Sequence, residues 1–108
     1  MKRVEIDSER WFDLDRALSW NEATYQSVSL GIVSVATHLP GLHEMLFITH
    51  LGTWLLHRWN AWRASEGPDI VSSQGYEMLT QADAAKWLSQ NGHRLPRELK
   101  DFDLMKEI

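Results

Sequence analysis

The chain has 108 residues, of which 44% are hydrophobic and 24% charged, and its formal net charge is −4. This length and composition predict a single domain over residues 1–108, and the absence of cysteine excludes disulfides and thiolate chemistry. The acidic balance disfavours a nucleic-acid partner, because phosphate binding relies on clustered Lys and Arg. No apolar run approaches the ~20 residues that cross a bilayer, and the first residues do not resemble a signal peptide, so we expect a cytoplasmic protein without a membrane partner.

The charged residues are unevenly distributed along the chain. From Ala23 to His57, Glu44 is the single Asp, Glu, Lys or Arg, whereas both flanking segments are rich in charge. The middle segment is therefore expected to form the core. A Gly-Pro-Asp turn within residues 65–69 separates a strand-like first part from a helical last part. This order predicts an α+β fold, with a small antiparallel sheet of three or four strands, a central hairpin, and two or three packed helices.

The segments before the central hairpin carry mixed signals. Alternation over residues 4–6 predicts a short first strand. Three apolar residues then recur at helical spacing: Trp11, Leu14 and Leu18. They predict a short helix over residues 13–20. Residues 27–37 are rich in β-branched side chains and predict one strand that changes its facing near Gly31.

Residues 43–61 predict a hairpin that turns at Gly52, where the chain needs a positive φ. If Thr49 faces Thr53, Glu44 meets Arg58, so that the lone acid faces the first base after it. This pairing favours that register. Both faces of the hairpin then carry apolar bulk. Either the helices wrap a curved sheet, or a second copy of the chain covers the remaining face, and we expect a homodimer.

The last part of the chain predicts two helices. Thr80 is expected to be the N-cap of a helix over residues 81–91. Gly92 then follows the helix at the position that favours a left-handed cap. Pro96 suits the first turn of another helix over residues 97–107.

Tryptophan and arginine are concentrated in the second strand of the hairpin and just after it. This combination is typical of interface hot spots and of base-stacking platforms, although the same rings also suit a small core. The candidate partner-binding residues are Trp54, Arg58, Trp59, Trp62 and Arg63. The acidic balance favours a protein partner of basic character over nucleic acid.

Five histidines provide the alternative to a binding role. His57 as a general base, with Arg58 steadying a phosphate, predicts a small RNA-cleaving toxin or another His-dependent hydrolase. The sequence has no phosphate loop, no nucleophile elbow and no metal-ligand spacing, so neither a cofactor nor a metal is predicted.

Three motifs resemble a group of small bacterial proteins encoded in mobile or plasmid-like regions. They are Gly52-x-Trp54-x-Leu56-x-x-Trp59-x-x-Trp62, Tyr76-Glu77-x-Leu79, and Ala84-Ala85-x-Trp87-Leu88-x-x-Asn91-Gly92-His93. The resemblance implies a bacterial or phage origin and a compact strand-then-helix domain, without a mechanism. Proteins in that setting often act as antitoxins, immunity proteins or inhibitors of host defence. The leading hypothesis is therefore a non-enzymatic protein-binding or inhibitory module.

Overall fold

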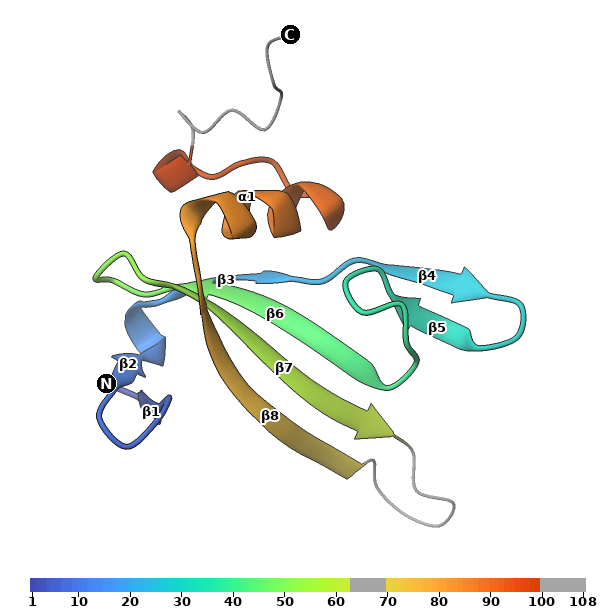
Figure 1. Ribbon diagram of the computed structural model, residues 1–108, viewed down its shortest axis with the longest axis horizontal. Coiled ribbons are helices and arrows are strands. Elements are labelled where there is room, and N and C mark those ends of the chain that lie inside the picture. The colour runs from blue at the N-terminus through green and yellow to red at the C-terminus, as the bar shows by residue number, and fades with distance from the viewer. Residues whose placement is uncertain (63–69, 100–108) are drawn as a thin grey trace, which may run out of the picture.

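A computed structural model of the protein describes residues 1–62 and 70–99 (Figure 1). This part contains eight strands, one α-helix and two single-turn 3-10 helices. In chain order they are β1 (Arg3–Glu5), β2 (Trp11–Asp13), η1 (Leu14–Arg16), β3 (Leu18–Asn21), β4 (Thr24–Ser27), β5 (Gly31–Ser34), β6 (Leu42–Ile48), β7 (Trp54–Trp62), β8 (Ile70–Leu79), α1 (Gln81–Gln90) and η2 (Arg97–Leu99).

Four antiparallel strands form the central sheet, in the order β3-β6-β7-β8. The predicted hairpin is its middle pair, and the predicted register is confirmed, because Glu44 lies opposite Arg58 and Ile48 lies opposite Trp54. The turn depends on Gly52, whose φ is +87°. This register fixes which side chains share a face of the sheet, since side chains alternate along each strand.

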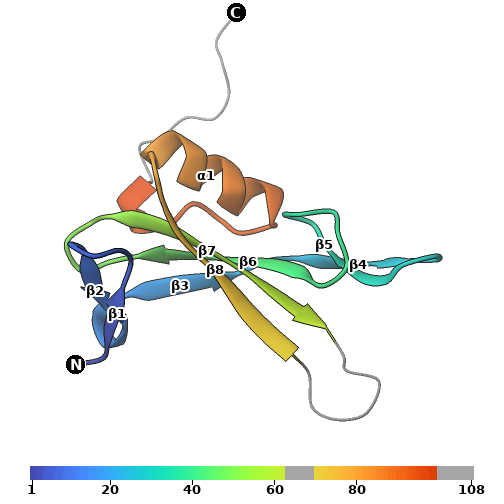
Figure 2. The same ribbon diagram turned by 60° about the horizontal axis from the view of Figure 1, so that its bottom comes forward.

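One face of the sheet is covered by α1, as Figure 2 shows. The helix begins as predicted: the Thr80 hydroxyl oxygen accepts a hydrogen bond from the Asp83 backbone N–H at 3.1 Å. Gly92 follows the helix with a φ of +78°. The apolar stripe of α1 packs on the hairpin in one buried cluster, which consists of Leu46, Ile48, Trp54, Leu56, Ala84, Ala85, Trp87, Leu88 and Leu99.

The opposite face is covered at one end by a small hairpin made of β1 and β2. Phe12 of β2 is 4% exposed and packs on Phe47 and Leu55 of the sheet. We call this part of the sheet, next to the Thr49–Thr53 turn, the closed end, because both of its faces are covered. At this end the cover is an N-terminal β-hairpin and not one of the predicted helices. Cover of the remaining face by a second copy of the chain stays a prediction.

The other end of the same face is different. It carries His43, His57 and Trp59, which are partly exposed, and Val71, which is 66% exposed. We call this part the open end. In the described part of the chain, Trp59 belongs to neither buried cluster.

The fold is mostly β, so the predicted α+β fold with two or three packed helices is wrong. Residues 13–20 contain one 3-10 turn between two strands. The helical spacing found there was misleading, because Trp11 is 42% exposed and Leu18 is 54% exposed, so the two do not form a buried stripe. Of the helix predicted over residues 97–107, the turn η2 is described, and residues 100–108 lie outside the described part.

The predicted single strand over residues 27–37 is also wrong. The chain instead turns back at residues 28–30, and β4 and β5 form a separate two-stranded hairpin beyond the end of β3 (Figure 1). Gly31 takes a φ of +78°, which suits the start of the returning strand. Gly31 therefore marks a turn between two strands and not a bulge within one strand. The predicted turn at residues 65–69 lies outside the described residues.

Candidate partner-binding surface

The structure separates the candidate partner-binding residues instead of grouping them. Trp54 is 3% exposed and packs against Trp20 beneath α1, with 5.6 Å between the ring centroids. It is a core residue. Trp62 ends β7, where its backbone pairs with Ile70, and its side chain is outside the described part, as is Arg63. Arg58 and Trp59 lie on opposite faces of the sheet.

Arg58 lies on the face that carries α1 and is bound within the protein. Its Nε donates a hydrogen bond to the Glu44 carboxylate at 2.8 Å. The other oxygen of that carboxylate accepts a hydrogen bond from Trp87 Nε1 at 3.1 Å. Because the Glu44 side chain is 6% exposed, its charge needs these partners, and the three residues together tie the helix to the hairpin.

Trp59 is the candidate residue that lies at the open end. Its ring centroid is 5.2 Å from that of His57 and 5.6 Å from that of His43. His57 in turn stacks on Tyr76, with 4.4 Å between centroids and an angle of 13° between planes. We call these four side chains the aromatic row. His57 stacks on both Trp59 and Tyr76, whereas His43 is tilted by 31° against Trp59, so that each ring contacts its neighbour.

Two hydrogen bonds hold the imidazoles of the aromatic row in place. His57 Nε2 is 3.0 Å from the Ser73 hydroxyl oxygen. His43 Nδ1 lies 2.5 Å from the Glu22 carboxylate. Partial burial lowers the pKa of His57 and raises the pKa of Tyr76, so burial favours the neutral form of each group.

Glu22 was not singled out by the sequence. Its side chain is 10% exposed, and its carboxylate also accepts hydrogen bonds from the Ser34 hydroxyl and from the Glu44 backbone N–H. Glu22 thereby connects the segment that follows β3 with two strands, β5 and β6. No local pattern marks this role, because its partners are 12 to 22 residues away in the sequence.

The arrangement does not combine His57 and Arg58 in one site. They are adjacent in β7, so their side chains project from opposite faces of the sheet. The guanidinium of Arg58 is bound by Glu44, and His57 lies among aromatic rings. Across residues 1–62 and 70–99, no group of three potential metal ligands comes together.

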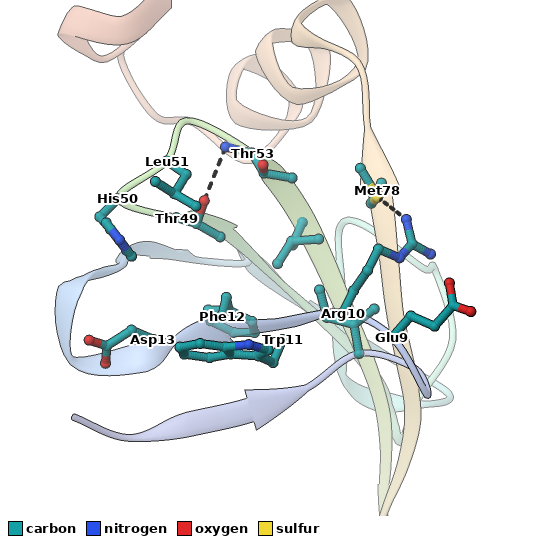
Figure 3. A pocket seen from close by; sticks show the side chains of 12 residues that line it. Glu9, Arg10, Trp11, Phe12, Asp13, Thr49, His50, Leu51, Thr53 and Met78 are labelled. Atoms are coloured by element: carbon teal, nitrogen blue, oxygen red, sulfur yellow. Dashed lines mark hydrogen bonds between the residues drawn. The ribbon is translucent and has the colours of Figure 1, made fainter.

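A separate cavity of about 440 Å³ lies at the margin of the closed end (Figure 3). It is lined by the loop and second strand of the β1–β2 hairpin, by the Thr49–Thr53 turn, and by Met78 of β8. Two of its charged residues are engaged within the protein: Arg10 Nε donates to Asp7 at 2.8 Å, and Asp13 accepts from two backbone N–H groups. The sequence did not predict this cavity, because three distant segments form it.

In comparisons with known proteins, no protein-family model, no curated protein sequence and no solved structure matches this chain. In the described part of the chain, no helix has both the length and the apolar character needed to cross a bilayer.

Proposed function

We propose that this protein is a non-enzymatic protein-binding module, of the antitoxin, immunity or anti-defence type, from a bacterium or phage. Its partner binds the open end of the sheet, where Trp59 is the central residue. The observation that carries the proposal is the contrast along one face of the sheet. The β1–β2 hairpin buries Phe47 and Leu55 at the closed end, whereas Trp59 at the open end is left partly exposed.

The aromatic row has the composition of a binding hot spot. A tryptophan surrounded by partly buried rings provides a large, rigid contact area with little loss of side-chain entropy on binding. The rings contact one another, and His57 stacks on two of its neighbours, which leaves less ring face for the stacking of nucleobases than a row of separate rings would. The surface therefore favours a protein over a single-stranded nucleic acid.

The charge of the chain favours a partner of basic character, and we propose that the two meet in the cytoplasm. With a formal net charge of −4, the protein attracts a basic surface over long range and repels an acidic one. Such attraction mainly accelerates association, so raising the salt concentration should slow association more than it changes dissociation.

The proposal is tested by capturing partners from the cells that produce the protein, after nuclease treatment, with three forms of the tagged chain. The wild type and Trp11→Ala should retain the same specific protein, and Trp59→Ala should lose it. Trp11 is the matched control because it is also an exposed tryptophan but lies on the β1–β2 hairpin. Circular dichroism confirms that each variant is folded.

Binding is then measured with the purified partner by titration calorimetry. Truncating a hot-spot tryptophan typically costs about 2 kcal/mol or more, which corresponds to at least a roughly thirtyfold weaker Kd. Equal affinities of Trp59→Ala and the wild type would place the binding surface elsewhere. A wild-type chain that retains no protein above an untagged background would contradict the proposed function itself.

A further inference from the structure

Strand β8 forms one border of the central sheet and pairs on one side, with β7. It is ten residues long, whereas β3 at the other border has four. A strand at the border of a sheet directs backbone N–H and C=O groups outward, where another strand can pair with them. The length of β8 makes it the more favourable border for such pairing.

The features that usually protect an edge strand are found in one half of β8 and not in the other. Two residues of β8 lie opposite Arg58 of β7, which makes a bulge, and Gly75 within it has a φ of +91°. Beyond the bulge, Glu77 carries a charge and Arg10 lies against Met78. Before the bulge, residues 70–74 contain neither charge nor proline, and Val71, Ser72, Ser73 and Gln74 are all exposed.

We propose that a second copy of this chain pairs with β8 through residues 70–74, in antiparallel orientation about a twofold axis at Ser72. In this register Ser72 faces its own counterpart, and Val71 faces Ser73 of the second copy. The register is consistent with the sheet, because Val71 and Ser73 lie opposite Ala61 and Trp59 and therefore share one face. The result is one continuous sheet of eight strands.

The charge pattern favours a second copy as the occupant. A chain of net charge −4 repels its own copies at most approaches, so self-association requires a segment that brings no like charges together. Residues 70–76 contain no charged side chain. Pairing at this edge leaves both faces of the sheet free and brings the two Trp59 side chains onto the same face. The inference goes beyond the proposed function and does not depend on it.

The test uses the absence of native cysteine, which makes every disulfide in a single-cysteine variant intermolecular. Residues directly opposite in an antiparallel pair have Cα atoms about 4.5–5.5 Å apart, within the range of a disulfide. Ser72→Cys should therefore form a covalent dimer on mild oxidation. Ser19→Cys, at an exposed position of β3 on the other border of the sheet, is the matched control and should remain monomeric on a denaturing gel.

A second variant measures the same contact without cross-linking. Ser72→Lys places two like charges across the axis, so light scattering should show the wild type as a dimer and the variant as a monomer. A wild type that is monomeric throughout a dilution series would overturn the inference, as would a Ser72→Lys dimer or equal cross-linking of the two cysteine variants. Trp59→Ala should remain dimeric, which separates this result from that of the partner-binding test.

Discussion

The closed and open ends of the sheet are formed by the same two strands, yet they differ in how they are covered. At the closed end, Leu55 is completely buried between the sheet and Phe12 of the N-terminal hairpin. At the open end, four residues farther along β7 on the same face, Trp59 is packed by neighbouring rings of its own sheet. The strands β1 and β2 have three residues each and cover one end. The reach of a short hairpin thus determines which apolar side chains become core and which remain available for binding.

The largest expected effect on stability is that of truncating Phe12 at the closed end, compared with truncating Trp59 at the open end. Phe12→Ala should lower the free energy of unfolding by about 3–5 kcal/mol, because it opens a cavity over a buried face. Trp59→Ala removes a larger but partly exposed ring and should cost about 1 kcal/mol, in the range of an ordinary substitution. Urea denaturation measures both values. Equal losses would mean that the two ends are buried to the same extent.

A second prediction concerns the ion pair on the helix face. Arg58→Met should lower the free energy of unfolding by about 2 kcal/mol, because Glu44 stays buried and keeps one hydrogen bond, from Trp87. The figure lies below the usual range for buried pairs since the Arg58 side chain is 40% exposed.

A substitution of the other partner, Glu44, provides the control for this ion pair. Glu44→Gln leaves Arg58 in contact with water and should cost about 1 kcal/mol, again by urea denaturation. If Glu44→Gln were the more damaging change, the buried carboxylate would not be the group that requires its partner.

A third prediction tests the helix that covers the other face of the sheet. Thr80→Ala removes the hydroxyl that caps α1 and should cost about 1 kcal/mol. Ser89→Ala, at an exposed position of the same helix, should change the stability by less than about 0.5 kcal/mol. Thermal unfolding of the two variants distinguishes the cap from a general effect of alanine.

The sequence predicted the elements whose signals are local. The turn at Gly52 and the pairing of Glu44 with Arg58 predicted the register of β6 and β7. Thr80, as the N-cap, correctly predicted that α1 begins at the next residue. Each signal involves residues that are close in sequence or that follow directly from a turn. The β1–β2 hairpin has strands of three residues, which are too short for periodicity to be informative, and its burial depends on strands more than thirty residues away.

The candidate site depended on residue type. Residue type singled out Trp59 as a candidate contact and His57 as the base of the alternative hypothesis, but it could not separate Trp59 from Trp54, which the helix buries. The alternation along β7 does separate them, because positions 54 and 59 have opposite parity in an unbroken strand. Glu22 and the cavity at the closed end arise from contacts between distant segments, for which a single sequence has no marker.

The smallest effect is expected from titrating the aromatic row. Burial lowers the pKa of His57 in the folded protein, so the unfolded chain, with a pKa near 6.5, binds the proton first as the pH falls. The contribution of His57 to stability is therefore complete above about pH 6.5 and is lost as the pH falls from there to the folded-state pKa. His57→Gln should remove this part of the pH dependence, measured as the difference between the urea midpoints of the two proteins. The NMR titration of the His57 ring measures the same pKa directly. A midpoint at or above about 6.5 would mean that the open end is more hydrated than its stacked rings imply, and would remove the reason to treat it as a preformed apolar surface.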